Sequence, residues 1–350
     1  MEKPFFSILL ISYNQERFIK EAFESCINQT YNNYEIVISD DCSTDSTYSI
    51  LQKLVEEYRN NNGTIHIILN KNNKNLGIGG NFQRAAEMSH GQWLAMAAGD
   101  DISLSNRLEL VKKHIDTHCY IYGINTARYI INETGDLLYY NFKENYLLGA
   151  DSIWHRDVFT KFKPLDYRIM SEDHVLNLRA LLLGGMLQIN TPSIKYRVSS
   201  QNYSIQKTTN LIESKLSALK KINYHINILN FRLEELYDRK SNCTYDKTTN
   251  QIIEKNKNLI KQLKKKEASY NKFVEVYNSS LKKKFTYLFS CSNLWLHSNI
   301  FFRLYNLLKM MNFISYKNMR KSDFKLDNGK QDNRIIKLTI KDYISNDELF

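Results

Sequence analysis

In the first part of this chain, short apolar runs alternate with segments whose apolar residues recur at helical spacing. This alternation limits most strongly what the chain can fold into. Residues 5–11 form a continuous apolar run that stops at Ser12-Tyr13-Asn14, as a strand buried on both faces does. We expect further strands and helices in alternation, with strands at 34–39, 64–69 and 93–98 and helices at 17–28, 47–58 and 81–88. Elements that alternate at this length predict parallel βαβ units and an α/β fold.

Two pairs of aspartates follow strands of this expected sheet. Asp40-Asp41 come after the second strand and Asp100-Asp101 after the fourth. Ligands of such sheets bind outside the carboxyl ends of the strands, so both pairs should lie on that edge. One pair alone reads as a helix cap or a polar loop. Two crowded pairs favour a balancing cation, and Mg²⁺ is often held by carboxylates together with substrate phosphates.

The basic charge of the chain is confined to its second part. The net charge is +11, but residues 1–204 carry 20 Lys+Arg against 23 Asp+Glu, whereas residues 205–350 carry 28 against 14. We therefore divide the chain into a first domain, 1–204, and a basic, mostly helical C-terminal region, 205–350. Apolar residues at 212, 219, 226 and 233 repeat every seven, which predicts a helical hairpin or coiled-coil face and a surface for homo-oligomerisation.

The segment 281–316 has two interpretations. Lys282-Lys283-Lys284 precede a stretch rich in aromatic and aliphatic residues, which suits either packing on the first domain or docking on a membrane surface. Nucleic-acid binding is disfavoured because no recognised module is present. Five scattered cysteines without a CxxC pair indicate a reducing compartment, and no apolar run is long enough to span a membrane. We expect a cytoplasmic protein, peripheral at the inner face of the membrane if the segment docks.

From residue 5 to about residue 204 the sequence resembles the family 2 glycosyltransferases, which have the GT-A fold and invert the anomeric centre. The resemblance is specific through the order and spacing of its motifs, which are Ser7–Asn14, Gln29-Thr30-Tyr31, Glu35–Asp45, Asn75-Leu76-Gly77 with Asn81, Gly91–Asp101 and Ser171-Glu172-Asp173. It implies a Rossmann-like domain for a nucleotide-sugar donor, a UDP-sugar before others. It also implies transfer to a hydroxyl of a saccharide or lipid-linked acceptor, in bacterial surface-polysaccharide synthesis.

The resemblance also implies roles for single residues. The candidates for nucleotide binding are Ser12, Asn14, Asp40, Asp41, Asn75, Gly77, Arg84 and Asp100. Among them, Asp41 would accept a hydrogen bond from the base, and Asp100 would contact the ribose or the donor sugar. Asp101 is the candidate ligand of Mg²⁺ or Mn²⁺ beneath the diphosphate.

The late acidic motif supplies the candidate catalytic pair. Asp173 would be the general base for the acceptor hydroxyl, with Glu172 beside it. Without the other motifs, both would read simply as acidic residues that stabilise a helix N-terminus. Trp154, His155 and Arg197 are candidates for acceptor contact, although a lone tryptophan or histidine is more often structural.

The sequence departs from the family at one point. Many relatives end the strand after the Glu-Asp helix in Tyr-Arg-x-His, whereas here Ser199 stands at the position of the histidine. A hydroxyl is a weaker metal ligand, so either a water completes the metal shell or Arg197 supplies the charge. The alternative function is a non-catalytic nucleotide-sugar-binding or scaffold protein that recruits partners through its basic part.

Overall fold

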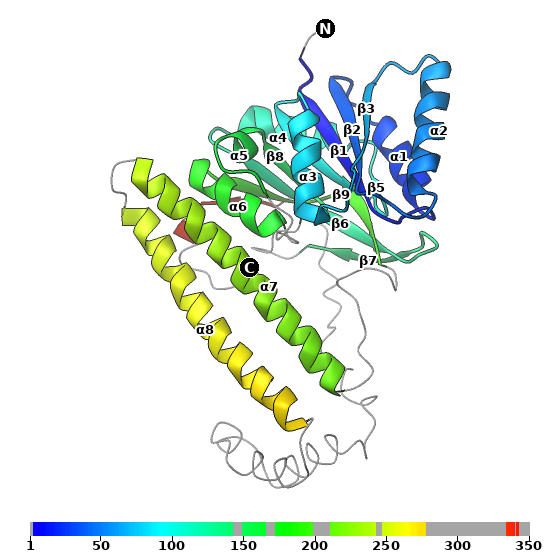
Figure 1. Cartoon of the computed structure of the whole chain (residues 1–350). Helices are drawn as coiled ribbons and strands as arrows, with labels where there is room; N and C mark the ends of the chain where they lie inside the picture. Colours follow the sequence, from blue (N-terminus) through cyan, green and yellow to red (C-terminus); the bar gives the residue numbers. More distant parts are fainter. Residues whose placement is uncertain are drawn as a thin grey trace. The chain divides into compact units, whose positions relative to one another are not determined.

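The computed structural model of this protein describes residues 3–142, 149–165, 172–198, 211–242, 247–277, 334–339 and 341–342. The chain forms two compact units (Figure 1). The first comprises residues 1–199 together with 327–350, and the second comprises residues 200–326.

A mixed sheet of ten strands runs through the first unit. The strands are β1 (Phe6–Ser12), β2 (Tyr34–Asp40), β3 (His66–Lys71), β4 (Trp93–Ala98), β5 (Ile102–Ser103), β6 (Gly123–Ile131), β7 (Leu137–Asn141), β8 (Ser152–His155), β9 (Met186–Arg197) and β10 (Ile335–Leu338). Their order is β10-β9-β6-β8-β4-β1-β2-β3, while β5 pairs with β9 and β7 with β6. From β4 to β3 neighbouring strands are parallel, as the alternation in the sequence predicts, and β8 runs antiparallel to β4.

Helices cover both faces of this sheet. Those described in the first unit are α1 (Ile19–Ile27), α2 (Thr47–Asn60), α3 (Gly77–Met88), α4 (Arg107–Thr117), α5 (Asp157–Thr160) and α6 (Glu172–Leu183). Successive side chains of a strand point to opposite faces. Ile8 and Leu10 therefore share a core with α1, α2 and α4, while α3 packs against β1 and β2 and also contacts α6.

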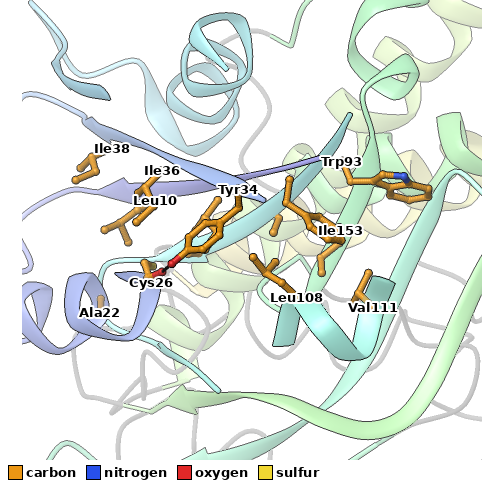
Figure 2. Close-up of a cluster of buried hydrophobic side chains, with 14 of the residues drawn as sticks. Leu10, Ala22, Cys26, Tyr34, Ile36, Ile38, Trp93, Leu108, Val111 and Ile153 are labelled. Carbon is orange, nitrogen blue, oxygen red and sulfur yellow. Dashed lines mark hydrogen bonds between the residues drawn. The ribbon is translucent and has the colours of Figure 1, made fainter. Parts of the chain in front are cut away.

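Figure 2 shows part of the core between the sheet and helices α1 and α4. Helix α1 contributes its buried stripe at helical spacing, Ile19, Ala22, Phe23 and Cys26. The hydroxyl of Tyr34 donates a hydrogen bond to the carbonyl of Cys26 over 3.1 Å, so its polar end is satisfied inside the core. This packing gives the strands a rigid base.

Helix α3 begins at Gly77, earlier than the helix at 81–88 that the sequence predicts. The glycine-rich stretch has a loop-like composition, but Gly77 adopts a positive φ of 72°, which glycine tolerates, and it opens the first turn. The side chain of Asn75 accepts a hydrogen bond from Gly77 N over 2.9 Å. The helix therefore starts directly at the loop that follows β3.

The second unit contains a hairpin of two long helices, α7 (Leu211–Asn242) and α8 (Lys247–Tyr277), which pack against each other (Figure 1). Ile222, Ile226 and Leu229 are buried on α7, as the heptad spacing predicts. Homo-oligomerisation through this region stays a prediction. Residues 281–316 and Ser199 lie outside the described residues. Within the described part of the chain, no helix is both long and apolar enough to cross a membrane.

The C-terminal segment returns to the sheet. Strand β10 runs antiparallel to β9, with Ile335 opposite Ile189 and Leu338 opposite Met186, and Leu338 is buried. The sequence assigns 205–350 to one helical region, and this strand departs from that assignment. A boundary near residue 204 remains a prediction.

A buried carboxylate, Glu35, stabilises the edge of the sheet at the amino ends of the parallel strands. Glu35 of β2 accepts hydrogen bonds through Oε1 from Ser7 Oγ (2.6 Å) and the backbone N–H of His90, and its Oε2 lies 3.1 Å from His90 Nδ1. Burial alone would raise the pKa of Glu35, but the hydrogen bonds from Ser7 and His90 outweigh it and lower the pKa below its ordinary value. The ionised form thus stabilises the fold.

We expect Glu35→Gln to lower the free energy of unfolding by about 1–3 kcal/mol at neutral pH, because it weakens charge-assisted hydrogen bonds in the core. A lowered pKa contributes stability that is complete above the unfolded value of about 4.5 and disappears as the pH falls through the folded value. The loss in the variant should therefore shrink below about pH 4.5. Urea unfolding across this range measures it, and a constant difference would contradict the assignment.

Candidate functional site

The carboxyl ends of β1, β2 and β4 form one edge of the sheet, where the first candidate residues gather. Ser12 lies opposite Asp40, and Ile11 lies opposite Ala98. Both aspartate pairs therefore follow strands that end at the same level. The expectation that they share one edge of the sheet is confirmed.

Asp40 shapes the loop after β2. Its Oδ1 accepts a hydrogen bond from Ser43 N over 2.9 Å, and its Oδ2 accepts from the hydroxyls of Ser43 and Ser12, the latter over 3.2 Å. The side chain is fully buried. Since donors of the chain occupy both oxygens, Asp40 suits the supporting role better than direct contact with a ligand.

Asp41 links this edge to the loop before α3. Its Oδ1 accepts hydrogen bonds from Asn72 Nδ2 (2.9 Å) and from Leu76 N (2.8 Å). Among the described residues, none donates a hydrogen bond to its Oδ2. One oxygen thus fixes the loop while the other is available to a donor group.

Asn14 closes the neighbouring loop. Its φ of 53° lies in the left-handed region, which asparagine tolerates better than most residues. Its Oδ1 accepts a hydrogen bond from Thr44 N over 2.8 Å, and its own N–H donates to Ser43 Oγ over 2.9 Å. Asn14 therefore stabilises the loop after β2 next to Asp40.

The second aspartate pair is held by the end of β9. The backbone N–H of Arg197 donates to Asp101 Oδ1 over 2.8 Å, and Arg197 Nε donates to the carbonyl of Asp100 over 2.9 Å. The guanidinium also pairs with Glu21 and lies over the ring of Phe18, 4.7 Å from its centroid. Arg197 thus supports the candidate metal ligand Asp101, while its guanidinium is held by Glu21 and Phe18.

The other oxygen of Asp101 is an orphan. Asp101 Oδ2 is buried, and no group of the described residues donates a hydrogen bond to it. Burial, followed by the charge of Asp100, raises the pKa of Asp101 well above its ordinary range. A divalent cation would satisfy the oxygen and favour the charged form, so Asp101 fits a metal ligand. Within the described residues, no group of three or more His, Cys, Asp and Glu side chains forms a ready-made metal cluster. The remaining ligands would therefore include substrate phosphates or water.

The late acidic motif opens α6. Asp173 Oδ2 accepts a hydrogen bond from Gly149 N over 3.0 Å, and its Oδ1 accepts from His174 N over 2.8 Å. Burial, and then the neighbouring charge of Asp173, raises the pKa of Glu172 to about 8. Glu172 is therefore mostly protonated at neutral pH, and Asp173 is the better placed of the two to accept a proton.

Three further candidates take part in packing, strand pairing or a surface ion pair. Trp154 is fully buried and donates from Nε1 to Asn177 Oδ1 over 3.0 Å, so its ring is closed to a sugar. His155 pairs with Trp93 at the start of β4, the edge opposite Asp100-Asp101. Their assignment to the acceptor is therefore corrected. Arg84 is exposed on α3, with its guanidinium 3.8 Å from Glu87.

Sequence reasoning missed a buried group of charges behind the aspartate edge. Arg107 and Arg128 are 2% and 3% exposed, and Asp151 is wholly buried. Asp151 Oδ2 lies 2.9 Å from Arg128 Nη2, although not aligned for a hydrogen bond. No motif in the sequence marks these residues. Only the burial of three isolated charges distinguishes them.

Solved structures with the same architecture define the class of fold. S. aureus TarS 1–349 in complex with UDP-GlcNAc superposes with a TM-score of 0.53 at 19% identity, covering 73% of this chain and 72% of that one. The mannosyltransferase PcManGT from Pyrobaculum calidifontis, in complex with GDP-Man and Mn²⁺, gives 0.51 at 11% identity, covering 89% and 86%. The fold of the first unit is that of the GT-A glycosyltransferases.

Sequence comparisons match the chain to one family of enzymes. Residues 7–171 match the model of glycosyl transferase family 2. An uncharacterised glycosyltransferase of Methanocaldococcus jannaschii is 27% identical over 196 residues, 52% of this chain and 66% of that protein. WfaP of Escherichia coli, a UDP-Glc:alpha-D-GlcNAc-diphosphoundecaprenol beta-1,3-glucosyltransferase, is 33% identical over 102 residues, 29% of this chain and 38% of WfaP. The chain spans less than two thirds of either relative, and its match to glycosyltransferase family 2 extends over residues 7–171.

The raised pKa of Glu172 predicts a pH-dependent cost to stability. The folded protein retains a proton that the unfolded chain releases between about pH 4.5 and about pH 8, so stability falls as the pH rises through this interval. Glu172→Gln removes that ionisation. We expect the variant to gain more in Tm, relative to the wild type, at about pH 9 than at about pH 5. Thermal unfolding at both values measures this, and a pH-independent difference would refute it.

Proposed function

We propose that this chain is an inverting glycosyltransferase that moves a sugar from a UDP-sugar to a hydroxyl of a saccharide or lipid-linked acceptor. The process would be surface-polysaccharide synthesis on the cytoplasmic side of the membrane. Support for the donor comes from TarS, solved with UDP-GlcNAc, and from WfaP, whose name includes UDP-Glc. Support for a lipid-linked acceptor comes from the diphosphoundecaprenol in the name of WfaP.

The observation that carries the proposal is the unpartnered buried Oδ2 of Asp101. It lies just beyond the strand end that shares an edge with Asp40 and Asp41. A carboxylate oxygen left without a donor in the interior is costly, so such a group persists where a ligand satisfies it. The ligand proposed is Mg²⁺ or Mn²⁺, and PcManGT was solved with Mn²⁺.

The residues of the chain divide the chemistry between binding and proton transfer. Asp41 would accept a hydrogen bond from the nucleotide base through its unpaired oxygen. Asp173 would accept the proton of the acceptor hydroxyl as that oxygen attacks the anomeric carbon and the nucleoside diphosphate leaves. Attack on the face opposite the leaving group inverts the centre, and one carboxylate suffices for it. The metal would neutralise charge on the leaving phosphates.

The competing function is a scaffold that binds nucleotide sugars without turnover. The chain keeps Asp41, Asp101 and Asp173, whereas a scaffold needs neither a metal carboxylate nor a base. A donor assay separates the two functions directly.

We expect the purified protein to release nucleotide from one member of a panel of UDP-, GDP- and dTDP-sugars when Mg²⁺ or Mn²⁺ is present. Asp101→Ala should reduce this hydrolysis at least about a hundredfold, because metal-assisted departure is lost. Asp116→Ala is the matched control, since Asp116 is an exposed carboxylate paired with Lys112. Nucleotide-induced thermal stabilisation without hydrolysis, even with saccharide acceptors added, would favour the scaffold.

We also propose that α8 docks on anionic lipid. Lys257, Lys261, Lys264 and Lys265 are exposed and recur at helical spacing, so they form one face of α8. Ile252, Ile253 and Ile260 are buried, which leaves the lysine face turned to solvent. Exposed lysines usually do no more than keep a helix soluble. Lys257 pairs with Glu254 over 2.8 Å, whereas no acidic residue lies between Lys257 and Lys265. The row is therefore complementary to anionic headgroups through Lys261, Lys264 and Lys265, each contributing about 1 kcal/mol near the surface.

A vesicle assay tests this docking. The protein should co-sediment with vesicles containing about 30% phosphatidylserine and not with pure phosphatidylcholine. Reversing the charge of Lys261, Lys264 and Lys265 to Glu should lower the bound fraction at least about tenfold.

The matched control for the vesicle assay reverses three exposed lysines of the first unit, Lys3, Lys53 and Lys113. It changes the net charge equally, so an equal loss in both variants would reduce the effect to net charge and overturn the docking face. Binding to nucleic acid instead of vesicles would overturn it as well.

A further inference from the structure

We propose that Asp151, held by Arg128 and bracketed by Arg107, is a positioning residue that sets Asp173 relative to Asp101. This inference rests on the proposed function for the roles of Asp173 and Asp101. Neither the family match nor the motifs assign a role to Asp151. The case is built from three contacts that connect the two carboxylates through the interior.

The first contact joins Asp173 to the segment before β8. Gly149 N donates to Asp173 Oδ2 over 3.0 Å, so this segment helps to fix where that carboxylate points. A Cβ on residue 149 would lie 2.7 Å from Glu172 Oε1 and 3.3 Å from Asp173 Cβ. It would also lie 3.5 Å from Met96 Sδ of β4. Glycine thus allows α6, the segment and β4 to approach closely.

The second contact anchors that segment to the sheet. Asp151, two residues further on, has its Oδ1 2.5 Å from Asn125 Nδ2 and its Oδ2 2.9 Å from Arg128 Nη2, both partners lying on β6. Ser152 N donates to the carbonyl of Gly149 over 2.9 Å and closes a tight turn between them. A shift of Asp151 would therefore be passed to Gly149 and on to Asp173.

The third contact reaches the metal side. Arg107 opens α4, and its Nη1 donates to Ser103 Oγ of β5 over 3.0 Å. Its Nη2 donates to the carbonyls of Ala150 and Ser152, each over 3.4 Å. Ser103 follows Asp101 by two residues, so one guanidinium spans the strand after Asp101 and both neighbours of Asp151.

Stability of the fold alone does not account for the buried charges of Asp151, Arg107 and Arg128. Arg107 Nε, together with Nε and Nη1 of Arg128, is buried and has no hydrogen-bond partner in the described part of the chain. Buried ion pairs often stabilise no more than apolar residues of equal volume, because desolvation offsets the attraction. These buried charges instead fix one defined arrangement of β5, β6 and the segment before β8. Catalysis is sensitive to displacements of about 1 Å, so this arrangement matters for a base and a metal site.

The test neutralises two buried carboxylates that lie at different ends of the sheet. Asp151→Asn preserves shape and removes the charge facing Arg128. Glu35→Gln is the matched control, because Glu35 is an equally buried, hydrogen-bonded carboxylate at the edge away from the site. Hydrogen exchange followed by mass spectrometry is the first readout and does not require activity.

In Asp151→Asn we expect faster amide exchange over residues 149–153 and at the start of α6, residues 172–177, whereas Glu35→Gln should leave both protected. Unchanged exchange at 172–177 in Asp151→Asn overturns the coupling, whether or not the protein turns over a donor. A protein that shows the coupled exchange but hydrolyses no donor refutes the proposed function and keeps the structural link.

The kinetic readout applies to the active enzyme. Asp151→Asn should lower kcat at least about tenfold while the donor KM changes less than about threefold, because Asp173 is displaced and the nucleotide edge is not. In an Asp173→Asn background the same change should have little further effect. An equal fall in kcat for Glu35→Gln, or full additivity with Asp173→Asn, overturns the positioning role.

A milder variant covers the case in which Asp151→Asn does not fold. Arg107→Lys keeps the charge but loses the fork that spans Ser103 and the carbonyls beside Asp151. It should produce the same exchange at 149–153 and 172–177 and a smaller fall in kcat. Wild-type exchange together with wild-type kcat in this variant overturns the proposal.

Discussion

The site depends on parallel strands that end in step. The register that places Ser12 opposite Asp40 and Ile11 opposite Ala98 brings residues from distant parts of the sequence to one sheet edge. Mutual repulsion opposes the approach of these carboxylates, and the sheet beneath them holds the strand ends in place. The core beneath the edge keeps the strands from sliding, because a slip of one residue would turn every buried side chain to the other face.

Hydrogen bonding shows which carboxylates of this edge support the loops and which have an oxygen available to a ligand. Donors of the chain occupy both oxygens of Asp40, so it holds the loop. Asp41 and Asp101 each use one oxygen for support, through Leu76 N and Arg197 N respectively. Their remaining oxygens are unpaired among the described residues. Among these three aspartates, the count of satisfied and unsatisfied oxygens thus separates the loop support from the two candidates for ligand contact.

Much of the first unit could be predicted from sequence, for physical reasons. Continuous apolar runs identify buried parallel strands, and acidic residues at their ends identify the ligand edge. The pairing of strands that lie far apart in the sequence could not be predicted. Strand β10 follows a long polar stretch, and its partner β9 lies far away in the sequence. His155 was misplaced because its neighbours in sequence do not reveal that β8 runs antiparallel to β4, which carries it to the opposite edge. The charges at Asp151 and Arg128 were missed because an isolated charge on a strand ordinarily faces water.

Adjacent carboxylates in different surroundings often divide acid and base roles, and the start of α6 has this form. Gly149 N and His174 N each donate to an oxygen of Asp173, whereas burial keeps Glu172 protonated at neutral pH. A neutral Glu172 adds no second negative charge beside Asp173, and a base surrounded by fewer negative charges accepts an incoming hydroxyl and leaving phosphates with less repulsion. The absence of a side chain at Gly149 permits close packing beside Glu172, since a Cβ there would lie 2.7 Å from Glu172 Oε1. Gly149 therefore does more than permit a turn: its N–H helps to orient Asp173, and its lack of a side chain leaves room for the buried Glu172.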